Sequence, residues 1–249
     1  MMRIAGLAAA LFLFATPLGA ADDPCAVPEY ITKVEGALPQ TAKAIKSGNL
    51  NVLIFGTRSS TLPGTEGAKN AYPARFEAAL KAKLPKANVS VTLEIALAKL
   101  TTDMATQLKE LVALRKPTLV LWQTGIFDAM KNVDQDQFRA ALDEGIAAVK
   151  AAGGDVILIN QQYSPRTESM INIPAYAEVM RSAAREADVP LFDRLSAMKY
   201  WSEQGTFDFT AHGADKGKLA ERVHECFGKL LVDLIVDTAK PTKTGFSRQ

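Results

Sequence analysis

The sequence has little histidine and little cysteine, with two residues of each among 249. Metal sites combine several cysteine, histidine or carboxylate ligands at short spacing, and no such cluster occurs along the chain. The glycine-containing stretch 64–67 also lacks the Gly-Lys-Ser/Thr ending of a phosphate-binding loop. We therefore expect neither a metal nor another cofactor.

No charge of one sign predominates in the sequence. The formal net charge of +2 gives no basis for binding to nucleic acid or to a membrane surface. After the first 21 residues, no apolar run reaches the about 20 residues that a membrane helix needs. The apolar fraction of 48% is sufficient for a buried core, and the length predicts one large domain.

Residues 1–21 have the pattern of a secretory signal peptide. Arg3 is the single charge, an apolar run follows it, and small residues precede the cleavage site. We expect cleavage after Ala21, with cleavage after Ala20 as the neighbouring option. An uncleaved anchor is the alternative, disfavoured because the run is short and Pro17 interrupts its end. The mature protein is therefore expected to be periplasmic or secreted, without a membrane span.

Both cysteines lie after this cleavage site. Two cysteines in an oxidising compartment commonly pair, so we expect a disulfide between Cys25 and Cys226; two free thiols are the alternative. The bridge would attach the N-terminal arm to the last predicted helix. It would close a loop of about 200 residues, which in the loop-entropy model contributes roughly 4–5 kcal/mol.

Short apolar runs alternate with helical patterns along the chain. Strands are predicted at 49–56, 87–97, 116–125, 153–162 and 188–193. Helices are predicted at 71–84, 101–116, 134–154, 173–187 and 215–237, with an earlier one near 27–48 that breaks near Pro39. This alternation predicts a three-layer α/β domain with a five-stranded parallel sheet and right-handed crossovers.

Ligands of such a sheet bind beyond the carboxyl ends of the strands, where the strand order reverses. In a flavodoxin-like order, the reversal lies between the first and third strands, which end in GTRSST (56–61) and QTGIFDAM (123–130). A serine in the first segment can be a nucleophile if a base reaches it; a turn that satisfies its own backbone is the alternative. His212, before the last predicted helix, is the candidate base. His224 lies inside that helix and is expected to be structural or solvent-facing.

The ordered set of segments resembles the SGNH/GDSL hydrolases, which are single flavodoxin-like domains that act on acyl esters. The resemblance spans about residues 50–235 and includes the serine-containing turn, AYPARFEAAL, KPTLVLWQTGIFDAM, DVILINQQYSP and the histidine-bearing loop before GKLAERV. It implies an arm with a helix at 22–48, a hydrolase-like domain at 49–239 and a flexible tail at 240–249.

The resemblance assigns catalytic roles to three side chains. The first family block reads G-D-S-x-T/S, and Ser59 takes the nucleophile position if one extra residue follows Gly56; Ser60 is the second candidate. The last block, D-x-x-H, supplies His212 as the base. Phe209 stands at the position of the acid, and Asp208 lies one residue away.

The oxyanion donors of the family are replaced in part. The block G-x-N-D becomes a segment from Gly125 to Asp128 in which Phe127 replaces the asparagine, and losing one such donor typically costs about 10²–10³ in rate. The side chain of Gln123 or Thr124 could substitute. No glycine stands in the preceding family block, where Ala98 or Leu100 supplies the nearby backbone N–H groups.

Two arginines at this edge favour an anionic ligand. Arg58 precedes the candidate nucleophile, and Arg166 follows the fourth predicted strand together with Tyr163, which could line a pocket. A surface pair of Arg166 with Glu168 is the alternative.

Two functions follow from these residues. The first is hydrolysis of acyl esters, such as acetyl esters of an envelope polysaccharide or a small lipid, by an exported Ser-His enzyme. The second is a catalytically inactive relative that binds an envelope glycan or a protein partner. Neither function calls for nucleic acid, and the sequence carries no indication of an oligomeric state.

Overall fold

The computed structural model describes residues 23–240. The predicted signal peptide at 1–21 and the end of the predicted tail, 241–249, lie outside the described residues. The chain forms a five-stranded, all-parallel sheet in the order β2-β1-β3-β4-β5. Its strands are β1 (Asn49–Gly56), β2 (Asn88–Ile95), β3 (Leu119–Gln123), β4 (Asp155–Ile159) and β5 (Leu191–Phe192). The predicted α/β fold with a five-stranded parallel sheet is therefore confirmed.

Burial along the strands follows their place in the sheet. Every residue of β3 and β4 is buried, because these inner strands are covered on both faces. Strand β2 lies at an edge, where Val89 is buried and its neighbours Asn88 and Ser90 are exposed. The short apolar runs of β3 and β4 thus correspond to strands buried on both faces, whereas β2 is only partly buried.

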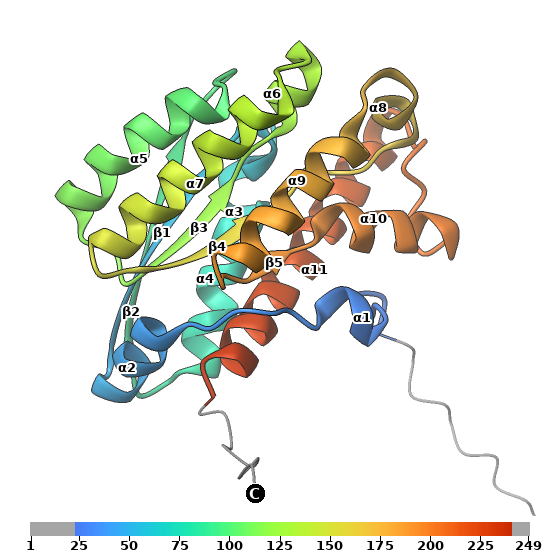
Figure 1. The fold of residues 1–249 in the computed structure, drawn as a ribbon. Helices are drawn as coiled ribbons and strands as arrows, with labels where there is room; N and C mark the ends of the chain where they lie inside the picture. The colour runs from blue at the N-terminus through green and yellow to red at the C-terminus, as the bar shows by residue number, and fades with distance from the viewer. Residues whose placement is uncertain (1–22, 241–249) are drawn as a thin grey trace, which may run out of the picture.

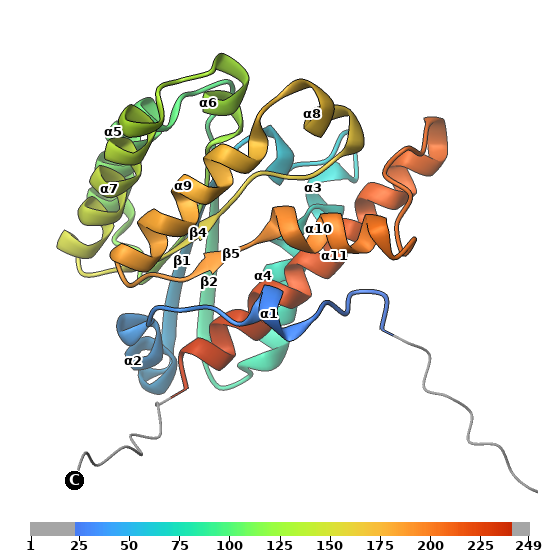
Figure 2. The ribbon, with the colours of Figure 1, turned by 45° about the vertical axis from the view of Figure 1, so that its right-hand side comes forward.

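Helices cover both faces of the sheet and make the fold three-layered. The first face is covered by α5 (Thr101–Arg115), α7 (Gln135–Ala151) and α9 (Ile173–Glu186) (Figure 1). The opposite face is covered by α4 (Tyr72–Lys83) and α11 (Gly213–Thr238), with α10 (Arg194–Glu203) beside them (Figure 2). Side chains of β1 alternate between the two hydrophobic cores: Leu53 and Phe55 pack in the first, Val52 and Ile54 in the second.

Shorter elements join the main helices and strands. The predicted helix near 27–48 is two helices, and Pro39 begins the second of them, since proline fits the first helical turn. Helices of four to six residues and the single turn η1 are too short for a periodic pattern, and the sequence did not predict them. The two helices of the predicted 27–48 segment are α1 (Glu29–Thr32) and α2 (Pro39–Ser47). The short elements that the sequence did not predict are η1 (Arg58–Ser60), α3 (Gly67–Asn70), α6 (Ile126–Lys131) and α8 (Pro165–Met170).

The N-terminal arm is attached to the domain at several points. Cys25 and Cys226 form the expected disulfide, which joins the arm to α11. The indole N–H of Trp201 donates to the carbonyl oxygen of Ala26 over 3.2 Å. Farther along, the N–H of Thr41 donates to the Asp155 carboxylate over 2.7 Å, which holds α2 at the start of β4.

Within residues 23–240, none of the helices combines the length and apolarity needed to cross a membrane.

Candidate functional site

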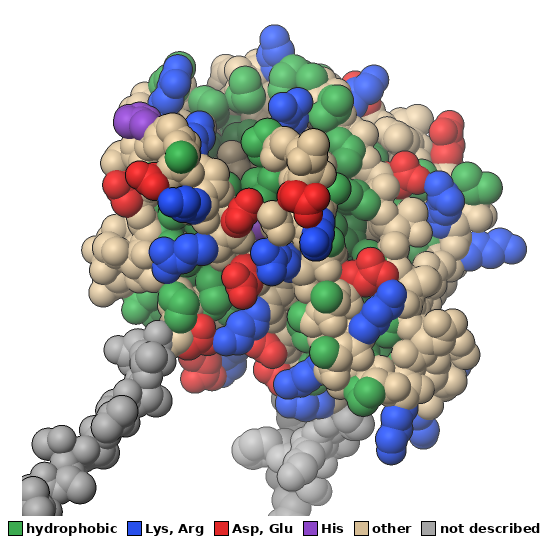
Figure 3. Space-filling model, turned by 180° about the vertical axis from the view of Figure 1, so that it is seen from behind, with side chains coloured by type: hydrophobic (Ala, Val, Ile, Leu, Met, Phe, Trp, Pro, Cys, Tyr) green, Lys and Arg blue, Asp and Glu red, His purple; other side chains and the backbone are tan. Residues whose placement is uncertain are grey.

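The carboxyl ends of the strands form the upper edge of the sheet in Figure 1, where α6 and α8 follow β3 and β4. Seen from behind, the surface is hollowed near this end, and hydrophobic side chains surround the hollow (Figure 3). Basic and acidic side chains are interspersed over the rest of that face. Another hollow, of about 570 Å³, lies beside the disulfide and is lined in part by Arg75, Phe207 and Arg222. No residue of β1, η1 or β3 lines this second hollow.

The chain turns sharply after β1, and the turn depends on a glycine. A Cβ atom at Gly56 would lie 2.1 Å from Ser60 Oγ and 2.9 Å from Ser60 Cβ, so only glycine leaves room for Ser60 to fold back against the strand. In the turn, Arg58 is exposed, Ser59 is half-buried and Ser60 is fully buried. Of the two candidate serines, Ser59 is therefore the one that reaches the surface.

Gln123, the last residue of β3, binds the hydroxyl groups of this turn. Its Nε2 donates to Ser59 Oγ over 2.6 Å and to Thr57 Oγ1 over 2.7 Å. Its Oε1 accepts from Ser60 Oγ over 2.7 Å. Thr124 points the other way and bonds Thr101. Of the two substitutes considered for the missing asparagine, Gln123 is thus the one that lies beside Ser59.

Arg194, the first residue of α10, completes this arrangement. Its Nη2 donates to Ser59 Oγ over 3.2 Å, and its Nη1 donates to Gln123 Oε1 over 3.3 Å. The guanidinium lies over the ring of Phe227, and the residue is only 2% exposed. Burial lowers the pKa of Arg194 to about 10. The sequence did not predict a role for Arg194; its one local sign was its place directly after the fifth predicted strand, at the edge where the site was expected.

Two further buried side chains adjoin these groups. Tyr72 shares a 3.1 Å hydrogen bond with Ser60 through its hydroxyl, and its N–H donates to His224 Nδ1 over 2.9 Å. Burial and the nearby Arg194 charge lower the pKa of His224 to about 3, so the imidazole is neutral at physiological pH. His224 is therefore a buried structural acceptor. Together, the groups around the nucleophile candidate form what we call the Ser59 cluster, made of Thr57, Ser59, Ser60, Tyr72, Gln123 and Arg194.

His212 and Asp208 lie in the loop 204–212 and at the start of α11. His212 is the residue preceding α11 and its side chain is exposed. Within the described chain, Ser59 Oγ bonds Thr57, Gln123 and Arg194, and His212 is not among its partners. The Asp208 carboxylate accepts from the hydroxyl and the N–H of Thr210, which lower its pKa. Hydrogen bonds therefore do not join these three catalytic candidates in the structure.

The segment after β3 places Asp128 inside the protein. Gly125 has φ +88°, and a Cβ there would lie 2.3 Å from Gln161 Nε2, so glycine is required at this position. The Asp128 carboxylate, 1% exposed, accepts from the hydroxyl of Thr101 over 2.7 Å and from its N–H. Burial raises the pKa of Asp128. Its carboxylate fastens α6 to the start of α5, while Phe127 is half-buried beside Lys131.

Arg166 and Tyr163 lie at the same edge, around α8. Arg166 is exposed, and Glu168 pairs with Lys199 instead of with Arg166. Tyr163 is 9% exposed and its ring packs edge-on against Phe209. Arg58 and Arg166 are thus both open to solvent, as an anionic ligand would need.

Similarity to known proteins agrees with this architecture. Residues 24–241 match the non-GDSL lipase-like family, and because the match spans most of its length, the chain belongs to this family. The first block departs from G-D-S, since both Thr57 and Arg58 stand between Gly56 and Ser59. A comparison with curated proteins gave no match.

Solved structures with similar folds are esterases and related hydrolases. TesA is 18% identical with a TM-score of 0.57, covering 74% of this chain and 99% of its own. Axe2, an acetyl xylan esterase from Geobacillus stearothermophilus, is 20% identical with a TM-score of 0.61, covering 76% and 95%. A two-domain esterase (CEX) active on acetylated mannans is 13% identical with a TM-score of 0.69, covering 89% and 59%. The resemblance to SGNH/GDSL hydrolases is confirmed as a shared fold.

Proposed function

We propose that the protein is an exported hydrolase of acyl esters, O-acetyl esters among them, with Ser59 as its nucleophile. The observation that carries this proposal is the environment of Ser59 Oγ. This hydroxyl is half-buried and lies at the edge of the sheet where the strands end. Its oxygen accepts hydrogen bonds from the N–H groups of Gln123 and Arg194. Donors fixed around an oxygen favour negative charge on it, as acyl transfer requires.

In the proposed reaction, Ser59 Oγ attacks the ester carbonyl carbon. The Oγ–carbon bond forms while His212 takes the hydroxyl proton, and the proton then passes to the leaving alcohol as its carbon–oxygen bond breaks. Water hydrolyses the acyl-serine to release the carboxylic acid. The N–H of Ser59 makes no hydrogen bond to the rest of the described chain and is free to stabilise the oxyanion.

His212 must reach Ser59 for this step. Because no direct hydrogen bond joins them, the proton passes through a water molecule or follows a movement of the loop 204–212, and catalytic hydrogen bonds often tighten only once substrate is bound. Asp208 would then orient His212, while Gly125 and the N–H groups near it border the acyl group. Arg58, Arg166 and Tyr163 would contact the remainder of the substrate.

The similar structures support this substrate class. Axe2 acts on acetylated xylan, the two-domain esterase is active on acetylated mannans, and a catalytic mutant of Axe2 is a serine-to-alanine exchange. The signal-peptide pattern and the disulfide fit an oxidising compartment outside the cytoplasm. An acylated envelope glycan is therefore a suitable substrate.

A second candidate function is non-catalytic binding of such a glycan or of a protein partner. It is favoured by the exposed position of His212, which makes no hydrogen bond with Ser59, and by Phe127 in place of the asparagine donor.

Hydrolysis of p-nitrophenyl acetate by the mature protein distinguishes the two functions. We expect Ser59→Ala to lower kcat by about 10³-fold or more, because removal of a nucleophile leaves only binding and oxyanion stabilisation. Ser169→Ala, an exposed serine on α8, is the control and should match the wild type. Equal rates for wild type and Ser59→Ala would remove Ser59 from the mechanism. A wild type that binds acetylated xylan without hydrolysing either ester would establish the binding function.

A further inference from the structure

Arg194 is a buried cation without a carboxylate partner among residues 23–240. Its Nη atoms bond only the neutral groups of Ser59 and Gln123, and its buried Nε has no partner. Among the titratable groups that face it, burial raises the pKa of Tyr72 and lowers the pKa of His224, so both are neutral at pH 7. An uncompensated charge in a protein interior costs several kcal/mol. A purely structural role does not account for a buried, unpaired positive charge at Arg194.

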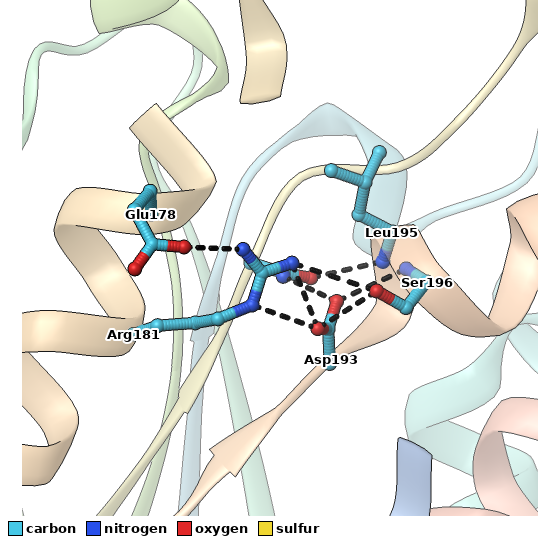
Figure 4. Close-up of polar contacts among 6 residues, drawn as sticks. Glu178, Arg181, Asp193, Leu195 and Ser196 are labelled. Atoms are coloured by element: carbon cyan, nitrogen blue, oxygen red, sulfur yellow. Dashed lines mark hydrogen bonds and ion pairs between the residues drawn. The ribbon is translucent and has the colours of Figure 1, made fainter. Parts of the chain in front are cut away.

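The carboxylate next to Arg194 in sequence is engaged elsewhere. Asp193 accepts from Arg181 Nε and Nη2 over 3.1 and 3.0 Å (Figure 4). It accepts from Asn160 Nδ2 over 2.7 Å. It also accepts from the N–H and the hydroxyl of Ser196. This network fixes the start of α10 against β4 and α9. It directs the Arg194 side chain toward Ser59 while leaving its charge unpaired.

The groups around Ser59 Oγ are donors. Gln123 and Arg194 each donate an N–H to the oxygen, and its remaining neighbour is Thr57 Oγ1 at 3.4 Å. A neutral hydroxyl needs no cation, whereas an oxygen that loses its proton does. The positive charge that is unpaired in the resting protein is therefore matched to a negative charge at this oxygen.

We propose that Arg194 is a catalytic residue that stabilises the negative charge developing on Ser59 Oγ as the hydroxyl loses its proton to the base. The inference rests on the proposed function. Arg194 stays protonated and donates to Oγ throughout, while the oxygen's electron pair forms the bond to the carbonyl carbon. This role deepens the proposed mechanism and is separate from the oxyanion donation lost with the asparagine that Phe127 replaces, because Arg194 donates to the attacking oxygen and not to the carbonyl oxygen of the substrate.

The test measures activity and stability on the same variants. With p-nitrophenyl acetate, Arg194→Met should lower kcat by about 10²–10³-fold, the loss typical when one fixed donor to a developing negative charge is removed, with little change in KM. Its melting temperature should stay level or rise, because an apolar side chain replaces an uncompensated buried charge. Arg222→Met is the matched control, since Arg222 also lies over an aromatic ring, that of Phe207, but is exposed and lines the hollow beside the disulfide, which no residue of the Ser59 cluster lines. It should keep wild-type kcat.

Chemical rescue separates a charge effect from misfolding. Arg194→Ala leaves a space for guanidinium, so added guanidinium chloride should restore at least tenfold of the lost kcat, whereas equal sodium chloride should not. The inference is overturned if Arg194→Met keeps wild-type kcat, or if both variants lose stability and guanidinium restores nothing. If the wild type itself does not hydrolyse the ester, both the proposed function and the catalytic role of Arg194 are contradicted.

Discussion

Gln123 shows how one amide fixes several side chains at the residue scale. Its Nε2 donates to two hydroxyl oxygens and its Oε1 accepts from Ser60 and Arg194, so turning the amide over would place its NH₂ group against Arg194 Nη1, which can only donate. The hydrogen-bond network therefore determines the orientation of the Gln123 amide. Because Nε2 donates to Ser59 Oγ, the Ser59 hydroxyl proton must point away from Gln123.

His224 makes the protein sensitive to acid. The pKa of His224 is about 3 in the folded protein and about 6.5 in an unfolded chain, so between these pH values the unfolded state binds more protons. The free energy of unfolding then falls as the pH falls through this window, by about 2 kcal/mol at pH 5. We expect His224→Asn to remove this loss, since an amide oxygen can still accept from the N–H of Tyr72.

Urea unfolding at pH 7.5 and pH 5.0 measures this contribution. The drop in unfolding free energy between the two pH values should be about 2 kcal/mol smaller in His224→Asn than in the wild type. Carboxylates titrate alike in both proteins and cancel in the comparison. His212→Asn, at an exposed histidine, should behave as the wild type. An unchanged drop in His224→Asn would contradict the assignment.

At the scale of elements, the turn from β1 into η1 is built on the missing side chain of Gly56. A Cβ would overlap Ser60, so Gly56→Ala should displace Ser60 from Gln123 and lower the unfolding free energy by about 1–3 kcal/mol. Gly217, inside α11, is the opposite case, since a Cβ there meets no atom within 4 Å.

The two glycine-to-alanine variants are expected to change the unfolding free energy in opposite directions. Gly217→Ala should raise the unfolding free energy by about 0.5–1 kcal/mol through helix propensity, while Gly56→Ala lowers it. Urea unfolding of both variants measures the difference, and p-nitrophenyl acetate hydrolysis should fall only in Gly56→Ala. A neutral Gly56→Ala would show that Ser60 can move at no cost.

The sequence predicted the main elements because their patterns are local. The five strands and the long helices carry apolar spacing that requires no knowledge of contacts. The direction of Gln123 could not be derived, since at the end of a strand the alternation of faces no longer applies. Arg194 could not be assigned either, because its contact with Ser59 joins chain segments 135 positions apart. Asp128 was placed in the binding set from its motif, whereas its burial against Thr101 depends on how α5 and α6 pack.

At the scale of the whole molecule, sheet order brings the site together. Strands β1 and β3 are neighbours although β2 lies between them in sequence, which sets η1 beside Gln123. Helix α10 follows β5 and lies on the same face of the sheet as α11. Arg194, its first residue, therefore contacts Ser59 and Gln123 and also lies over Phe227 of α11. The predicted flavodoxin-like reversal between the first and third strands therefore located the cluster, while its chemistry came from β5 and α10.

The disulfide acts on the whole chain instead of the site. It joins residues 201 positions apart, so its loss should lower the unfolding free energy by about 3–5 kcal/mol, chiefly because the unfolded chain is no longer restrained. We expect the double variant Cys25→Ser, Cys226→Ser to show this loss in urea unfolding. Its kcat for p-nitrophenyl acetate at 25 °C should stay near the wild-type value, since both cysteines line the second hollow, which no residue of the Ser59 cluster lines. Dithiothreitol should lower the stability of the wild type to that of the variant and leave the variant unchanged. A loss below about 1 kcal/mol would mean that the other contacts of the arm, among them the Trp201 bond to Ala26, hold it without the bridge.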